Sequence, residues 1–173
     1  MEIRGNMEPV SAYLALGANL GDRQGQLQGA REALATADGI RVLAASPLYE
    51  TEPVGGPPNQ PLYLNAVLQV ATSRSCRDLL ALCQEVETRF GRYRQEPWGP
   101  RTLDIDLLFY GLETLNQPGL IIPHPRLHQR RFVLVPLADL APDLCHPAFG
   151  RSVRQLLAAL GDGEKVRLYA KDW

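Results

Sequence analysis

Residues 101–110 read "RTLDIDLLFY", a stretch in which two aspartates, Asp104 and Asp106, stand among apolar residues. In a β-strand, residues two positions apart point to the same face of the sheet. Asp104 and Asp106 therefore project together, and the apolar residues beside them point to the opposite face: Leu103, Ile105 and Leu107. The alternation predicts a strand with one buried apolar face and one face that displays two carboxylates.

The segments before this strand show helix and strand patterns in a regular order. Asp22 and Ser75 belong to residue types that cap helix N-termini, and Asp78 makes a capping box with Ser75. We expect, in chain order, a strand over 10–19, a helix from Asp22 to about Asp38, strands over 40–51 and 62–72, a helix from Ser75 to about Phe90, and the strand over 101–110. The order β-α-β-β-α-β predicts an α+β fold with a ferredoxin-like core, whose two helices pack on one face of an antiparallel sheet.

The C-terminal third adds elements to that core. We expect a short helix within 120–143, a helix over 152–160 and a small last strand over 165–169. Two other segments are unsuited to regular structure. Residues 52–61 hold four prolines and two glycines, and residues 92–100 form a polar stretch that carries arginines. Both are expected to be exposed loops.

The length and composition of the chain predict one globular domain. Its 173 residues are 45% hydrophobic, enough for a single core, so we expect one domain over 10–173 after a loose leader at 1–9. A net charge of -1 gives no general attraction to nucleic acid or to anionic membranes, and no apolar run is long enough to span a bilayer. The three cysteines show no metal-type spacing, which predicts a reduced, cytoplasmic protein. Because no strong exposed apolar stripe is evident, we expect a monomer.

The two aspartates require a positive partner. Two carboxylates held close together repel each other, and a hard divalent cation relieves that repulsion. Magnesium takes oxygen ligands and is commonly held by one or two carboxylates together with substrate phosphates. The pair therefore points to Mg²⁺ with a nucleotide. The alternative is that both aspartates simply face solvent on a half-exposed strand, since two aspartates in this spacing are a weak signal alone.

Arginines around the aspartates favour the metal and phosphate interpretation. Sixteen of the 18 basic residues are arginines, whose planar fork suits phosphate. They flank the strand on both sides: Arg92, Arg94 and Arg101 before it, and Arg126, Arg130 and Arg131 after it. Neither a P-loop nor a dinucleotide-binding glycine pattern occurs, so a nucleotide would be held by arginines and metal instead.

Five stretches, in order, resemble the motifs of a known family: "YLALGANLGDR", "SPLYETEPVG", "YLNAV", "WGPRTLDIDLLFYG" and "IPHPRLHQRRFVLVPL". The family is 6-hydroxymethyl-7,8-dihydropterin pyrophosphokinase of folate biosynthesis, and the resemblance covers about residues 11–143. It implies transfer of the β,γ-pyrophosphoryl group of ATP to the hydroxymethyl oxygen of the pterin, with release of AMP. ATP and the pterin would be the small-molecule substrates, with two Mg²⁺ ions on the triphosphate.

The resemblance also implies roles for particular residues. The catalytic positions are Arg92, Arg101, Asp104 and Asp106, of which the two aspartates bind the metal. The pterin positions are Thr51, Val54, Tyr63, Asn65, Trp98 and Phe132, with Tyr63 and Phe132 stacking on the ring. The ATP positions are Glu87, Arg92, Arg94, Arg101, Ile105, His124 and Arg130. Loops 52–61 and 92–100 would act as lids that exclude water.

The chain departs from the family pattern at three residues and in one loop. Gln95, Pro97 and Gly119 replace expected basic residues, and the loop after Val54 is one residue longer. These departures bear on lid closure and ATP affinity rather than on the reaction type. No residue stands out as a general base.

Three other functions fit parts of the pattern. A ferredoxin-like sheet can bind single-stranded RNA through exposed aromatics, but two acids on the open face would repel its phosphates. A regulator that binds without turnover is disfavoured by the intact Asp104, Asp106, Arg92, Arg101 and His124. A different magnesium-dependent transferase would share the metal site but lack the set Tyr63, Asn65 and Phe132.

Overall fold

The computed structural model describes residues 8–54, 58–91 and 102–173. The elements are β1 (Val10–Ala18), α1 (Arg23–Ala35), β2 (Ile40–Ala45), β3 (Leu48–Thr51), β4 (Tyr63–Thr72), α2 (Cys76–Arg89), β5 (Asp104–Tyr110), β6 (Leu115–Gln117), β7 (Leu120–Ile122), a 3₁₀ turn η1 (Leu127–Gln129), α3 (Arg131–Leu140), α4 (Val153–Leu160) and β8 (Val166–Ala170). The expected order of strands and helices is confirmed as far as β5, apart from one strand that is divided in two.

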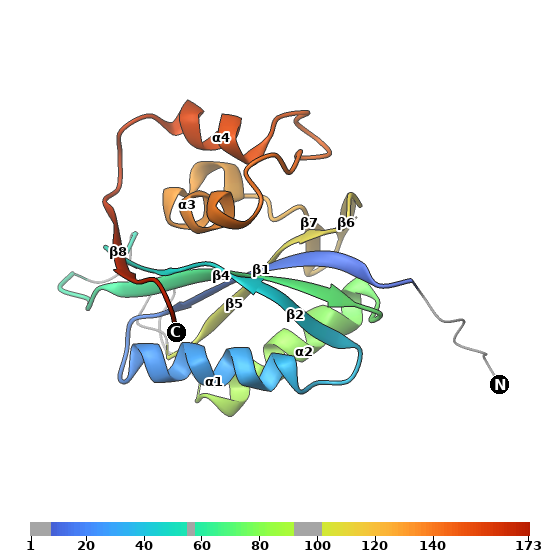
Figure 1. Ribbon diagram of the computed structural model, residues 1–173, viewed down its shortest axis with the longest axis horizontal. Helices are drawn as coiled ribbons and strands as arrows, with labels where there is room; N and C mark the ends of the chain where they lie inside the picture. The colour runs from blue at the N-terminus through green and yellow to red at the C-terminus, as the bar shows by residue number, and fades with distance from the viewer. Residues whose placement is uncertain (1–7, 55–57, 92–101) are drawn as a thin grey trace.

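Six strands form one antiparallel sheet in the order β5-β1-β4-β3-β8, with β2 also paired to β4, and β6 and β7 pair in a separate two-stranded sheet. Helices α1 and α2 cover one face of this sheet (Figure 1). This is the predicted α+β, ferredoxin-like core. The central strands β1 and β4 pair from Val10 opposite Thr72 to Ala18 opposite Leu64, and so form the middle of the sheet.

The opposite face of the sheet is covered as well. Helix α3 lies over it and α4 packs against α3 further out, so helices lie on both sides of the sheet rather than on one face alone (Figure 1). A second group of buried residues forms between these helices and the sheet, and it includes Tyr13, Val67, Phe109 and Leu134. The sequence pattern predicted the C-terminal helix but not the face that it covers.

A β-bulge explains the long apolar run at the end of β5. Leu14 pairs with Leu107 and Tyr13 pairs with Phe109, so Leu108 is an extra residue in the ladder. As a result Leu108 and Phe109 both pack into the second core, while Leu107 remains in the first. The strict alternation that predicted the aspartate face therefore holds only for the first half of the strand.

The expected strand over 40–51 is two strands, because Ser46 and Pro47 interrupt it. Proline has no N–H for a ladder hydrogen bond. Ser46 keeps the chain attached to β4 at this point: its N–H donates to the Val67 carbonyl over 2.9 Å, and its Oγ accepts from the Val67 N–H over 2.8 Å. In this way β2 and β3 both pair with β4.

The helix caps follow the sequence closely. Asp22 accepts a hydrogen bond from the Gly25 N–H, and Ser75 accepts one from the Asp78 N–H. Helix α1 ends at Ala35, three residues earlier than expected, and Gly39 takes the positive φ of 76° that lets the chain turn into β2. Cys76 and Cys83 are buried in the first core.

Candidate active site

A cavity of about 510 Å³ lies over the sheet face that carries the two aspartates. Its walls come from β1, β3, β4, β5, the start of α3 and the connection between α4 and β8. Residues far apart in the sequence meet there. Eight of the residues expected at the site line it: Thr51, Val54, Tyr63, Asn65, Asp104, Asp106, Arg130 and Phe132.

The two aspartates occupy one end of this cavity. They lie on β5 and are partly exposed, whereas Leu103, Ile105 and Leu107 are buried in the first core, as the alternation predicted. Gly17 and Ala15 of β1 pair with Asp104 and Asp106 respectively. Because these neighbours are small, open space remains beside the carboxylates.

Arg130 connects the carboxylates to an aromatic ring. Its Nη1 lies 3.7 Å from Oδ2 of Asp106, and its guanidinium lies 5.7 Å from the centre of the Phe132 ring. Arg126 lines the same cavity. Both arginines come from the turn that precedes α3, so this turn brings positive charge to the aspartate end.

A polar pair forms the middle of the cavity floor. The Asn65 Nδ2 donates to Oγ1 of Thr51 over 2.6 Å, and both residues are buried. This bond fixes the amide so that its Oδ1 is the acceptor that remains for a ligand. Tyr63 of β4 and Phe132 of α3 line the cavity from the sheet and from the helical layer.

Gly17 makes this arrangement possible, and sequence reasoning missed it. It pairs with Asp104 on one side and with Asn65 on the other, so the three residues form one row across the sheet. A Cβ at position 17 would lie only 2.8 Å from Oδ1 of Asn65. A glycine in the interior of a predicted strand is the signal that could have identified it, because such glycines mark close approach.

His124 lies next to the cavity rather than in its wall. It lines a neighbouring hollow of about 320 Å³. Its Nδ1 accepts the Arg126 N–H over 3.1 Å, which leaves the ring proton on Nε2. Burial, with the positive charge of Arg130, lowers the pKa of His124 to about 4, although Asp104 acts in the opposite direction. At neutral pH the ring is therefore an uncharged hydrogen-bond donor.

Glu87 and Ile105 lie on the other side of β5. The Glu87 side chain is buried, and its Oε2 accepts the Ile105 N–H over 3.1 Å. Neither residue is among those that line the cavity. The hydrogen bond joins α2 to the strand between the two aspartates. Four other expected site residues lie outside the described residues: Arg92, Arg94, Trp98 and Arg101.

The carboxylate pair fits magnesium. Within residues 8–54, 58–91 and 102–173, no group of three or more acidic, histidine or cysteine side chains could enclose a metal. Two carboxylates on one strand beside an open cavity match an ion that keeps several waters and shares substrate phosphates. Zinc-type enclosure by four protein ligands has no counterpart in this part of the chain.

The site thus has carboxylates and arginines at one end, and an amide, a hydroxyl and aromatic rings further along. Together with the fold, this combination is typical of a transferase that moves a phosphate-containing group onto a flat aromatic substrate. Residues 13–142 match the model of the 7,8-dihydro-6-hydroxymethylpterin-pyrophosphokinase (HPPK) family. The chain belongs to this family. It transfers pyrophosphate from ATP to the hydroxymethyl group of 6-hydroxymethyl-7,8-dihydropterin in folate synthesis.

Two curated relatives match this chain over most of their own length. A 2-amino-4-hydroxy-6-hydroxymethyldihydropteridine pyrophosphokinase of Pseudomonas aeruginosa is 46% identical over 147 residues, which cover 85% of this chain and 90% of that protein. The Bacillus subtilis protein of the same name is 43% identical over 158 residues, covering 91% and 89% respectively. The predicted family and reaction are therefore confirmed.

Solved structures support the fold. An HPPK-DHPS of Plasmodium falciparum, crystallised with pterin and p-hydroxybenzoate, superposes with a TM-score of 0.71 at 14% identity. The match covers 91% of this chain but only 45% of that longer chain. At this level of identity the likeness shows the three-dimensional arrangement and nothing about individual residues.

Proposed function

We propose that the 510 Å³ cavity is the active site for this transfer, with the triphosphate at the aspartate end and the pterin over Asn65. The observation that carries the proposal is the row Asp104, Gly17 and Asn65 across three paired strands. Neighbouring strands lie roughly 4.8 Å apart, so the aspartate and asparagine backbones are separated by about 10 Å. That separation suits a bicyclic ring whose reacting hydroxymethyl group faces the aspartates.

The pterin is held by stacking and by hydrogen bonds in its plane. Tyr63 and Phe132 offer aromatic faces, and Oδ1 of Asn65 accepts from the N–H groups of the ring edge. Because Thr51 already fixes the amide, little conformational freedom is lost on binding. Val54 lines the same region, and the family pattern adds Trp98 as a closing side chain.

Asp104 and Asp106 would hold magnesium, with two ions expected. When bound, the metal would supply positive charge that offsets the charge of the triphosphate. Arg130 lies against Asp106 and can contact phosphate from the same position. The neutral His124 has its N–H donor at Nε2. Because the ring is uncharged, it does not compete with magnesium for the carboxylates of Asp104 and Asp106. By motif, Arg92, Arg94 and Arg101 contribute further positive charge, and Glu87 and Ile105 contact ATP.

We further propose that residues 10–173 act as one domain, as a monomer in the cytoplasm, and without nucleic acid. The three cysteines are free, which suits a reducing compartment. Among the residues that the structure describes, no helix is long and apolar enough to cross a bilayer. The acidic face of β5 disfavours a nucleic-acid backbone.

The test is AMP release from ATP in the presence of Mg²⁺ and 6-hydroxymethyl-7,8-dihydropterin. Asp106→Ala should lower turnover by about a hundredfold or more, because a transition-state charge loses its metal support. The melting temperature should change little, since Asp106 is partly exposed. Asp143→Ala is the matched control: this aspartate is exposed and does not line the cavity. Near-normal turnover in Asp106→Ala would contradict the metal assignment.

A further inference from the structure

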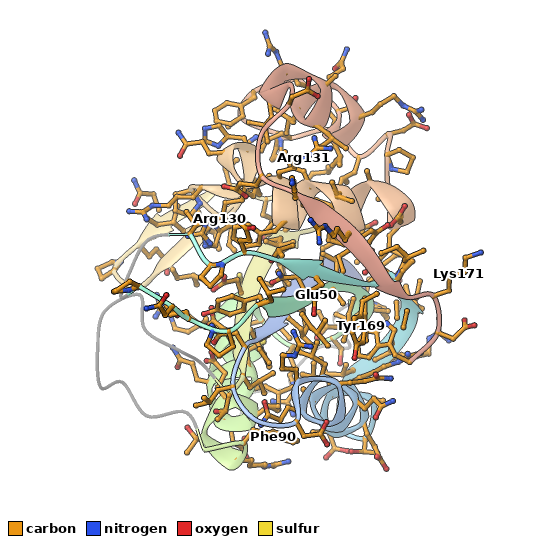
Figure 2. All side chains as sticks on the ribbon, turned by 90° about the vertical axis from the view of Figure 1, so that its left-hand side faces the viewer. Glu50, Phe90, Arg130, Arg131, Tyr169 and Lys171 are labelled. Atoms are coloured by element: carbon orange, nitrogen blue, oxygen red, sulfur yellow. The ribbon has the colours of Figure 1, made fainter. Side chains whose placement is uncertain are left out.

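Glu164 lines the cavity although it lies outside the matched family segment, which ends at residue 142. It belongs to the connection between α4 and β8, in the C-terminal third of the chain. Figure 2 faces the edge of the sheet where β8 runs and shows Arg131 beside this connection, where Arg131 donates to the Gly161 carbonyl over 3.4 Å. The C-terminal elements therefore bring a carboxylate to the substrate cavity.

The pairing of β8 with β3 places Glu164 near the end of β3. Strand β8 runs antiparallel to β3, with Val166 opposite Thr51 and Leu168 opposite Tyr49. Glu164 stands two residues before Val166, at a bend that leads into β8, and it lines the cavity from there. Thr51, the last residue of β3, is hydrogen-bonded to Asn65 on the cavity floor.

Glu164 is also at the end of the cavity furthest from the metal ligands. The strand order β5-β1-β4-β3-β8 places four strand steps between the aspartates and β8, which amounts to about 19 Å. Glu52 and Val54, which follow β3, line the cavity at this same end. The cavity thus has arginines with two carboxylates at one end, and the acidic residues Glu52 and Glu164 at the other.

This charge pattern matches the chemistry of the pterin. The hydroxymethyl group must face the aspartates, so the opposite edge of the bicycle, which carries the 2-amino group and a ring N–H, points toward β3 and β8. Both groups are hydrogen-bond donors, and an ionised carboxylate can accept strong hydrogen bonds from both of them. A negative charge there also disfavours a triphosphate bound in the reverse direction.

We propose that Glu164 is a specificity-determining residue that accepts hydrogen bonds from the donor edge of the pterin. The proposal rests on the placement of the pterin given above. It assigns a part in substrate recognition to the connection between α4 and β8.

The test compares Glu164→Gln with Asp162→Asn. Asp162 lies in the same connection and carries the same charge, but it lines only a neighbouring hollow. Pterin is titrated into each protein saturated with Mg²⁺ and a non-hydrolysable ATP analogue. Glu164→Gln should bind pterin about tenfold more weakly, the effect of losing one charge-assisted hydrogen bond, and should raise the pterin KM with kcat and the ATP KM unchanged. Asp162→Asn should behave as the unmodified protein.

A second measurement uses a pterin analogue without the 2-amino group. The unmodified protein should prefer the parent pterin, and Glu164→Gln should lose most of that preference. Unchanged pterin binding in Glu164→Gln, or equal weakening in Asp162→Asn, would overturn the proposal. Failure of the proposed function has a different signature, because Asp106→Ala would then retain AMP release whatever Glu164→Gln does to pterin affinity.

Discussion

Gly17 shapes the cavity floor because it has no side chain. Its position between Asp104 and Asn65 leaves room for the asparagine amide and for a flat ligand above it. A protein interior is packed too closely to absorb a methyl group placed 2.8 Å from a fixed oxygen. The amide would have to rotate and release Thr51.

Gly17→Ala should therefore raise the pterin KM by about tenfold or more, with a smaller effect on the ATP KM. The reason is loss of the Asn65 acceptor rather than loss of fold. Steady-state kinetics with each substrate varied would measure the two values. Gly163→Ala is the control for the glycine-to-alanine change, because nothing lies within 4 Å of a Cβ there. If the effects of Asn65→Ala and Gly17→Ala on pterin binding were additive in the double variant, Gly17→Ala would not act through Asn65, and the explanation would be wrong.

His124 predicts how stability depends on pH. Its pKa is about 4 in the folded protein against an ordinary value of 6.5. The unfolded chain therefore binds a proton at a pH where the folded protein does not, and stability is lost as the pH falls from about 6.5 toward 4. We expect a loss of roughly 2–3 kcal/mol over this window. Urea unfolding at pH 7.5 and 4.5 would measure it, and His124→Gln should show a correspondingly smaller loss.

At the scale of elements, a hydrogen bond between a helix and a strand holds the segment that carries Asp104 and Asp106. Helix α2 supplies Glu87, whose carboxylate meets the Ile105 N–H between the two aspartates. Cys83 on the same helix is buried, and burial together with Glu87 raises the pKa of its thiol to about 12. Helix α2 thus presents an apolar face with one buried carboxylate, and that carboxylate binds the backbone of β5.

Glu87→Ala should lower the free energy of unfolding by about 2 kcal/mol, because a buried N–H loses its acceptor. Glu87→Gln keeps an acceptor oxygen at the same place and should retain most of the stability. Denaturant titration of both variants would decide this. A large rise in the ATP KM for Glu87→Gln at unchanged stability would instead favour the direct contact with ATP that the family pattern implies.

At the scale of the whole molecule, two cores on opposite faces of the sheet have different functions. The first core, between the sheet and α1 with α2, supports the backs of the strands. The second core supports α3, whose N-terminal end carries Phe132 and Arg130 into the cavity. Tyr49 of β3 donates to Asp139 of α3 and adds a polar attachment between the two layers.

Leu134→Ala and Leu27→Ala should separate these two functions. Both leucines are fully buried, one in each core, and each substitution should cost about 2–5 kcal/mol of stability. Leu134→Ala should also raise the pterin KM, because α3 positions Phe132. Leu27→Ala should leave it unchanged at a temperature where both variants are folded. Equal KM values would show that the position of α3 does not depend on the second core.

Much of the site follows from local sequence pattern. The strand period of two determined that Asp104 and Asp106 share a face, and helix-capping residues determined where α1 and α2 begin. The short motifs identified the family, because motif residues keep their spacing along the chain. These features depend on neighbours within a few residues, and a sequence displays such neighbours directly.

Only the tertiary structure decided which distant segments meet. Pairing of β1 with both β4 and β5 puts Gly17 between an aspartate and an asparagine, and pairing of β3 with β8 brings Glu164 to the same cavity. The depressed pKa of His124 and the buried position of Glu87 likewise arise from burial and from charges on other elements. Burial and cross-strand contact are properties of packed surfaces, and the residues that form those surfaces are separated in sequence by tens of positions.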